Sequence, residues 1–128
     1  MDYKAPPRRS KSDATGHFWY QRLTALALLP LSVWLLLFLN LALHAPYAET
    51  LAWLTSPVHA AALAVWSIVA IYHAALGLQV VLEDYVSTLS LRRWAIRVSH
   101  LIFSLLGIAA LAAIIYILYT QGNYGLRL

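Results

Sequence analysis

The sequence predicts an all-α membrane protein in which three transmembrane helices form a bundle. Of the 128 residues, 62% are hydrophobic and only 11% are charged, and the mean hydropathy is +0.69. These values lie outside the range of soluble globular domains. Charged residues are absent from three stretches, at about 23–43, 58–82 and 98–119. Each stretch is long enough to cross about 30 Å of hydrocarbon as a helix.

Residues 1–22 differ in composition from the rest of the chain. They are basic, contain proline and serine, and are poor in apolar residues, which suits a solvated arm better than a signal peptide. The first apolar stretch is also long for the core of a signal peptide, and no clear small-residue cleavage site follows it. We therefore predict a cytoplasmic arm over 1–22 and a three-helix transmembrane anchor over 23–128.

The lysines and arginines are distributed unevenly around the three spans. Nine basic residues against five acidic ones give a net charge of +4, but their placement is more informative than their sum. Basic residues precede the first span and lie between the second and third, whereas 44–57 contains none. By the positive-inside rule, the N-terminus and the second loop are cytoplasmic, and the first loop and the C-terminus face outward. The pattern indicates a membrane protein and no nucleic-acid partner.

The composition of the spans favours close packing between helices. Pro30 lies inside the first span and predicts a mild kink, while the second and third spans are rich in alanine and contain glycine. We expect loops of about 14 and 15 residues to join the helices. The chain has no cysteine, which excludes thiolate metal sites, iron–sulfur clusters and cysteine nucleophiles.

The stretch HAALGLQVVLEDY, residues 73–85, places a histidine inside the second span. At about 100° per residue, Trp66, Gly77 and Asp84 share the helix face of His73. A glycine one turn after the histidine leaves room for a flat, wide group such as a porphyrin to approach the backbone. Alternatively, the imidazole hydrogen-bonds to a neighbouring helix or lines a wet crevice.

The depth of each histidine limits how haem could be held. His73 lies about 13 Å inside the cytoplasmic end of its helix. No other side chain of this chain is placed to be the second axial ligand. His100 lies too close to the cytoplasmic surface to face His73, and His59 lies near the outer surface on the same helix. Methionine can also bind haem iron, but the only methionine is Met1. Six-coordinate haem would therefore need an axial ligand from another subunit. His59 is about 21 Å from His73 along the helix, which is too far for both to bind the same iron. It is therefore either a ligand of a second haem or an interfacial polar residue.

The second span ends on Glu83, Asp84 and Tyr85. A phenol beside a carboxylate at this depth can hydrogen-bond to a quinone carbonyl and help supply its protons. Alternatively, these residues only end the span and enter water. Arg22 approaches the membrane from the same side, where it can pair with a haem propionate or with Asp84, or act as a positive-inside anchor.

The spacing of His73, Gly77 and Asp84–Tyr85 resembles the second helix of the smaller hydrophobic membrane-anchor subunit of succinate dehydrogenase, respiratory complex II. The stretch GHFWYQRLTALALLPL is similar to the start of helix one in that family. The three spans and the N-terminal arm also agree, so the resemblance covers most of the chain.

This resemblance implies a role for each candidate residue. His73 would be an axial ligand of the iron of haem b, and the other axial histidine would come from the larger hydrophobic anchor subunit. Tyr85 would donate a hydrogen bond to ubiquinone, with Asp84 supporting that site or its proton supply. Arg22 would lie near the haem propionates and the quinone pocket.

The resemblance further implies partners and a location. A flavoprotein subunit and an iron–sulfur subunit would dock on the cytoplasmic face of a bacterial inner membrane, leaving the C-terminus in the periplasm. The chain alone would not be catalytic, because it has no dinucleotide-binding glycine motif and no soluble domain. Its share would be anchoring, haem ligation and part of a quinone site.

Two alternatives remain open from the sequence. The first is the anchor of a related quinone-linked enzyme, such as fumarate reductase or a two-haem cytochrome b that uses His59 as well as His73. The second is a small membrane scaffold or transporter without haem, in which His73 is a packing group.

Overall fold

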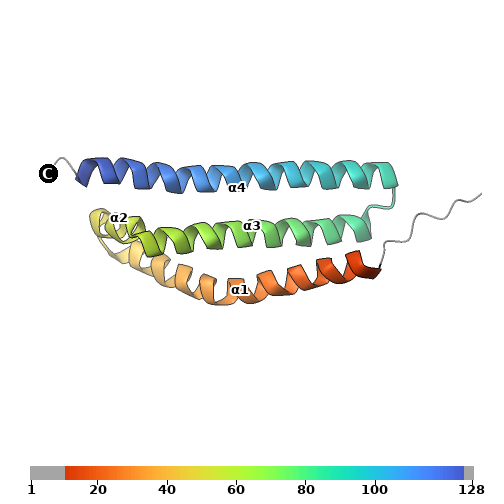
Figure 1. The fold of residues 1–128 in the computed structure, drawn as a ribbon, viewed down its shortest axis with the longest axis horizontal. Coiled ribbons are helices and arrows are strands. Elements are labelled where there is room, and N and C mark those ends of the chain that lie inside the picture. Colours follow the sequence, from red (N-terminus) through yellow and green to blue (C-terminus); the bar gives the residue numbers. More distant parts are fainter. Residues whose placement is uncertain (1–10, 126–128) are drawn as a thin grey trace, which may run out of the picture.

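The computed structural model describes residues 11–125, and the side chains of residues 15–121 among them. Four helices make up this part of the chain: α1 (Lys11–His44), α2 (Tyr47–Thr55), α3 (Pro57–Tyr85) and α4 (Leu89–Gly125) (Figure 1). Helices α1, α3 and α4 are long and apolar enough to cross a membrane. They contain the three predicted spans, so the all-α membrane class is confirmed.

The connections are shorter than the predicted loops of about 14 and 15 residues. The first connection contains α2, which follows two residues after α1 and is separated from α3 by Ser56 alone. Only residues 86–88 separate α3 from α4. Pro57 opens α3, where its fixed backbone angle suits the first turn of a helix. The expectation was wrong because the spans continue as helix beyond the apolar stretch, which keeps backbone groups hydrogen-bonded near the membrane.

Helix α1 also begins earlier than expected. Residues 11–22, which we predicted to be part of a solvated arm, belong to this helix, whereas 1–10 lie outside the described residues. The helix runs through Pro30 without a break and is bowed along its length (Figure 1). Its N-terminal turns therefore form a helical extension of the first span.

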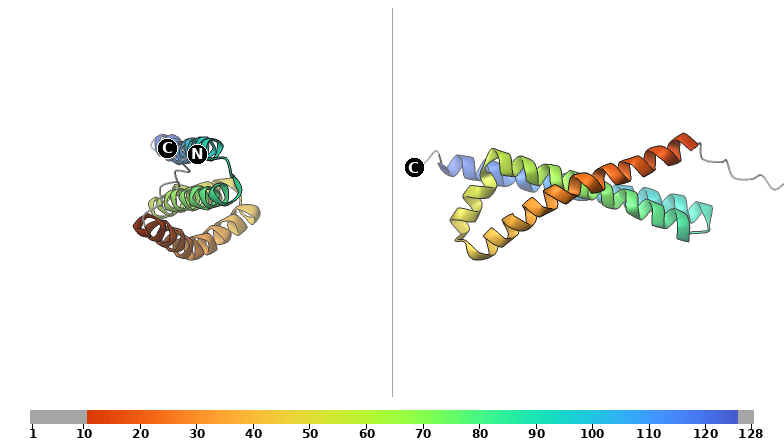
Figure 2. Two further views of the ribbon diagram at one scale, coloured as in Figure 1. Left: turned by 90° about the vertical axis from the view of Figure 1, so that its right-hand side faces the viewer. Right: turned by 90° about the horizontal axis from the view of Figure 1, so that it is seen from below.

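The three long helices lie in one row, with α3 in the middle. Helix α3 contacts α1 on one side and α4 on the other, and no Cα atom of the described part of α1 lies within 8 Å of one in α4. The end-on view in Figure 2 shows this row, and its second view shows α1 crossing α3 obliquely. Both broad faces of the row are therefore open to lipid or to another chain.

Little of this arrangement is buried. Among the described residues, only Ala60, Ala75, Leu76 and Ser99 are buried, and the Ser99 hydroxyl donates to the Ile96 carbonyl oxygen at 2.8 Å. Leucine, isoleucine, tyrosine and tryptophan side chains are exposed along all three long helices. In a membrane this surface needs no aqueous solvation, because lipid chains are as apolar as leucine.

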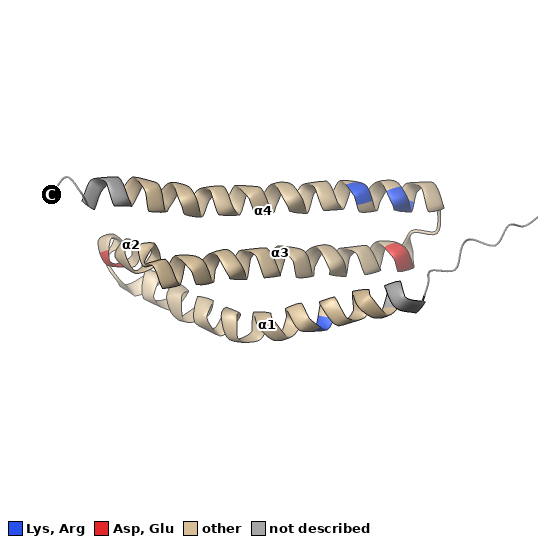
Figure 3. Ribbon diagram, in the orientation of Figure 1, with Lys and Arg blue, Asp and Glu red and all other residues tan. Residues whose placement is uncertain are grey.

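Charge separates the two ends of the molecule. Arginines of α4 and the acidic end of α3 lie together at one end, and α2 carries an acidic residue at the other (Figure 3). Among the described side chains, Glu49 of α2 is the only charged group at that second end. This asymmetry is the feature from which the positive-inside rule predicts orientation.

Candidate functional site

His73 is held by a hydroxyl of the neighbouring helix α1. Its Nδ1 lies 2.8 Å from Thr24 Oγ1. The Thr24 hydroxyl donates to carbonyl oxygens of its own helix, at 2.8 Å to Tyr20 and 3.1 Å to Gln21. With its proton engaged there, Thr24 Oγ1 accepts the Nδ1–H of His73, an assignment made from the hydrogen-bond network. Nε2 then carries the lone pair, which is the tautomer that binds a metal ion.

The face of α3 that carries His73 packs against α1. A Cβ atom added to Gly77 would lie 3.5 Å from Gln21 Nε2, and Trp66 Nε1 donates to Ser32 Oγ at 3.1 Å. The shared face inferred from the sequence is therefore present. The side-chain amide of Gln21 of α1 lies beside Gly77 at ordinary contact distance from an added Cβ atom, and the room for a flat group at Gly77 stays a prediction.

Arg22 lies closer in depth to His73 than to Asp84. Its neighbour Gln21 sits against α3 at residue 77, so Arg22 is about 5 Å from the level of His73 and about 12 Å from that of Asp84 along the helix axis. Its guanidinium carbon lies 4.4 Å from the centroid of the Phe18 ring. Among the described residues, no ion pair joins Arg22 to Asp84.

Asp84 and Tyr85 occupy the last turn of α3 and are both exposed. Tyr85 is 84% exposed. Within the described part of the chain, neither side chain forms a hydrogen bond to another side chain. Their polar groups are thus open to a ligand or a partner subunit, as the predicted quinone site requires.

A set of hydrogen bonds joins α3 to α4 near the end of α3 that carries Asp84 and Tyr85. Gln79 Nε2 donates to Glu83 Oε1 at 2.8 Å, and His100 Nε2 donates to Gln79 Oε1 at 3.2 Å. Arg92 Nη1 donates to the Glu83 carbonyl oxygen at 3.2 Å. His100, whose role the sequence left open, thus makes a contact between α4 and α3.

His59 belongs to an aromatic cluster at the opposite end. Its ring stacks on Trp53 with centroids 3.6 Å apart and planes 15° apart, and its Nδ1 donates to the Trp53 carbonyl oxygen at 2.9 Å. Trp53 also stacks on Phe38 and on Trp34 of α1, with centroid distances of 4.5 and 5.5 Å. This arrangement is consistent with the interfacial interpretation of His59, and it leaves the in-plane lone pair of Nε2 available, as in His73.

Sequence reasoning named His17 only as part of a candidate docking surface with Trp19, and it did not single out Gln21 or Thr24, which face α3. His17 Nε2 and Gln21 Oε1 are buried and have no hydrogen-bond partner among the described residues. Together with Thr24 they lie at positions i, i+4 and i+7 of α1, which share one helix face. This polar spacing within an apolar helix is the signal that would have identified them.

The described residues contain no group of three or more His, Asp or Glu side chains placed to hold a bare metal ion. A single histidine suffices as this chain's ligand to haem, because the porphyrin supplies the four equatorial nitrogens. The geometry of His73 fits that demand, since Nδ1 is engaged and Nε2 is left to bind.

Three membrane-length helices, with a hydrogen-bonded histidine in the central one and polar groups at its end, define a multi-pass membrane protein. The family that matches the chain agrees with this class. Residues 7–116 match the model of the succinate dehydrogenase/fumarate reductase transmembrane subunit, and the chain belongs to this family.

Similar proteins carry a more specific description. The chain is 33% identical to the succinate dehydrogenase hydrophobic membrane anchor subunit of Rickettsia felis, over 94% of this chain and 98% of that protein. It is 36% identical to the subunit of the same description from Rickettsia bellii, over 88% of this chain and 90% of that protein. No solved structure shows a significant match.

Proposed function

We propose that this chain is the membrane-anchor subunit of a succinate:ubiquinone oxidoreductase and that it holds one side of haem b through His73. The family and the similar proteins support the anchor role. The observation that carries the haem assignment is the hydrogen bond from His73 Nδ1 to Thr24 Oγ1. Metal-binding histidines usually donate their second ring N–H in this way, which fixes both tautomer and ring orientation.

The other histidine that holds the haem would come from the larger hydrophobic anchor subunit. His59 lies at the other end of α3 in an aromatic stack, and His100 is bonded to Gln79. Haem b supplies one-electron storage inside the membrane. Arg22 lies between the levels of His73 and Asp84, nearer to His73. It is the residue of this chain that pairs with a haem propionate.

Ubiquinone is reduced at the cytoplasmic end of α3. The Tyr85 hydroxyl donates a hydrogen bond to a quinone carbonyl, which stabilises negative charge that develops on that oxygen. Reduction of a quinone to a quinol takes two electrons and two protons, and the Asp84 carboxylate at the water boundary passes protons toward the site. The exposure of both side chains supports this assignment.

The remaining partners bind on the cytoplasmic side. A flavoprotein subunit and an iron–sulfur subunit oxidise succinate and deliver electrons, since this chain has no cysteine for a cluster. The arginines between α3 and α4 support a cytoplasmic location for this end in a bacterial inner membrane.

The reduced-minus-oxidised spectrum of the purified membrane complex tests the haem assignment. The wild-type complex should show a b-type band at about 550–560 nm, and His73→Ala should abolish or shift it. A complex that copurifies with the same subunits and shows an unchanged band after this substitution would exclude His73 as a ligand and favour a packing role.

Haem stoichiometry separates this proposal from a two-haem cytochrome b. We expect one haem per complex. His59→Phe keeps an aromatic ring to stack on Trp53 but removes the nitrogens, so it should leave haem content unchanged. Two haems in the wild type, with one lost in this variant, would establish the two-haem alternative.

A further inference from the structure

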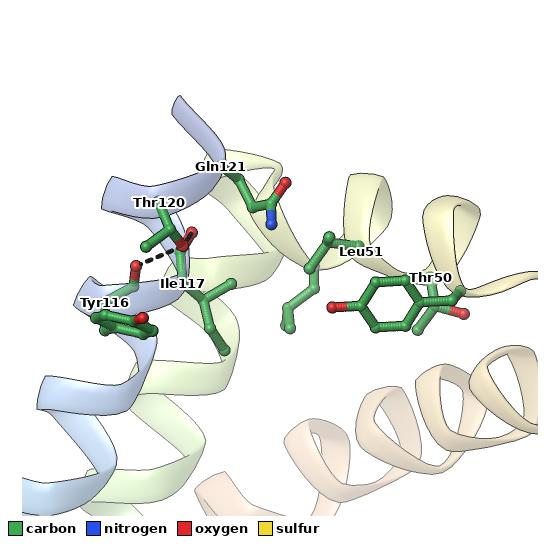
Figure 4. A pocket seen from close by; sticks show the side chains of 8 residues that line it. Thr50, Leu51, Tyr116, Ile117, Thr120 and Gln121 are labelled. Atoms are coloured by element: carbon green, nitrogen blue, oxygen red, sulfur yellow. Dashed lines mark hydrogen bonds between the residues drawn. The ribbon is translucent and has the colours of Figure 1, made fainter. Parts of the chain in front are cut away.

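Clefts beside α4 differ in the side chains that surround them. The cleft between α2 and α4, at the end of the molecule opposite Tyr85, has a volume of 430 Å³, and the described residues that line it include no charged one (Figure 4). That lining does not select a particular ligand. A smaller cleft of 240 Å³ lies between α3 and α4, and its lining includes His100 and Ser104. This smaller cleft lies nearer to the arginines of α4.

Three arginines lie near the start of α4, and they differ in what they contact. Arg92 Nη1 donates to the Glu83 carbonyl oxygen of α3 at 3.2 Å. Arg93 and Arg97 are exposed, and neither forms a hydrogen bond or an ion pair with a described residue. They are four residues apart, so their side chains project from one face of the helix. Two unpaired guanidinium groups one turn apart can donate several hydrogen bonds to a single phosphate group.

Both arginines lie where lipid headgroups meet the hydrocarbon. Arg97 directly precedes 98–119, which contains no charged residue and is long enough to cross the membrane. Trp94, between the two arginines, is exposed, and tryptophan is enriched at this boundary. Arg93 lies about 6 Å farther out along the helix. The two guanidinium groups are therefore within reach of lipid phosphates.

The smaller cleft continues the arginine face of α4 into the hydrocarbon. At about 100° per residue, His100, Ser104 and Gly107 all fall within about 80° of Arg97 around the helix. These three residues line the cleft, and Ile71 lines it from α3. Along the axis, the lining residues of α4 lie about 5–15 Å farther into the membrane than Arg97. A phosphate at the arginines and an alkyl chain in the cleft thus suit a single amphiphilic molecule.

The net charge at this end of the molecule selects among phospholipids. Its described side chains include four arginines and two carboxylates, namely Arg22, Arg92, Arg93, Arg97, Glu83 and Asp84. With the histidines neutral, these groups give a net charge of +2. A positive surface at the headgroup level favours an anionic lipid over a zwitterionic one.

We propose that Arg93 and Arg97 bind the phosphate of one anionic phospholipid and that one of its acyl chains lies in the cleft between α3 and α4. Both guanidinium groups donate to the phosphate oxygens, and the chain lies along Ile71 and Gly107. The inference does not rest on haem or quinone binding.

Native mass spectrometry of the detergent-purified complex, with phosphatidylglycerol added as the probe, tests the proposal. The wild type should retain one phosphatidylglycerol per copy of this chain. Arg97→Gln should reduce retention about five-fold, and Arg93→Gln/Arg97→Gln should reduce it further. Arg92→Gln is the matched control, because it removes the same charge from an arginine that is turned toward α3, and it should reduce retention less than about two-fold.

Two outcomes of this measurement would overturn the proposal. Equal losses in Arg97→Gln and Arg92→Gln would show a general effect of charge instead of a site. Unchanged lipid retention in the double variant, together with loss of a copurifying subunit, would assign the arginines to a protein contact.

Cross-linking in the unmodified complex tests the location of the lipid. Phosphatidylglycerol with a photoreactive group in its acyl chain should cross-link to 68–75 or 100–107, and it should do so more than phosphatidylethanolamine with the same chain. Cross-links confined to other segments, or equal yields from the two lipids, would refute the site even if the variants fail to assemble.

Discussion

The Thr24 hydroxyl connects the backbone of α1 to the imidazole of α3. It donates to Tyr20 and Gln21 carbonyl oxygens and accepts from His73 Nδ1. A hydroxyl whose proton is committed to its own helix cannot donate to the imidazole as well, so the tautomer of His73 is set from α1. In the proposed haem site, Thr24 would therefore act on Nε2 of His73 through the ring, without contact with the iron.

Replacing Thr24 with valine should raise the reduction potential of haem b. A hydrogen bond at Nδ1 increases the basicity of the ligand and stabilises the oxidised iron. If the bond is about 1 kcal/mol stronger in the oxidised state, its loss corresponds to about 40 mV for a one-electron couple. Redox titration of the haem band measures this shift. Thr24→Ser should restore the wild-type potential, and equal potentials in the wild type and Thr24→Val would disprove the positioning role.

Replacing Tyr85 with phenylalanine should slow quinone reduction by about two- to ten-fold, the cost of one hydrogen bond of about 0.5–1.5 kcal/mol. Reduction of an artificial dye by the soluble subunits should persist, because that reaction does not use the end of α3. Steady-state assays with a short-chain ubiquinone and with the dye compare the two activities. Unaltered quinone kinetics would remove Tyr85 from the site.

At the scale of elements, the contact between α1 and α3 determines the environment of His73. Gly77 allows Gln21 to approach the backbone of α3, and Ser32 with Trp66 holds the two helices together farther along. The separation of α1 from α3 thus controls whether Thr24 reaches the imidazole. A side chain at residue 77 would test this dependence.

Gly77→Leu should weaken haem binding, and Gly77→Ala should be tolerated. A Cβ atom would make ordinary contact with Gln21 Nε2 at 3.5 Å, but the larger side chain must displace α1 at a cost of about 1–3 kcal/mol. The temperature at which the purified complex loses its haem band reports the effect. Gly107→Leu is the matched control, since its Cβ would meet only the end of Ile71 at 4.0 Å. Equal losses in both leucine variants would contradict a specific role for the α1–α3 contact.

The whole molecule is a row of three helices whose broad faces are open (Figure 2). A closed bundle would shield its central helix, whereas this row leaves part of α3 exposed to a partner on either side. Such an arrangement suits a chain that contributes one axial ligand and receives the other from a second subunit. The same openness explains why so many large apolar side chains lie at the surface.

Fusion proteins should confirm the orientation of this row. Green fluorescent protein fused to the N-terminus should fluoresce, because it folds in the cytoplasm, and alkaline phosphatase fused to the C-terminus should be active in the periplasm. The physical reason is the placement of the arginines at the end shared by α3 and α4. The reverse pattern would invert the topology and move Tyr85 away from the cytoplasmic subunits.

Hydropathy alone predicted the three spans, because lipid requires about 20 uninterrupted apolar residues and helical backbone hydrogen bonds. It did not predict α2, which is apolar but only nine residues long, or the helical turns over 11–22, since short or polar segments near the interface carry no such compositional requirement. The spacing from His73 to Asp84–Tyr85 identified the candidate site, because helical periodicity follows directly from sequence separation.

The sequence by itself determined the class of protein, the three spans and the positions of His73, Asp84 and Tyr85 along the central helix. Only the tertiary structure decided that Thr24 holds the imidazole, that Gln21 lies beside Gly77, and that Arg22 is nearer in depth to His73 than to Asp84. These features depend on the register between α1 and α3. Register between helices is set by side-chain packing across the interface, which periodicity within one helix does not specify.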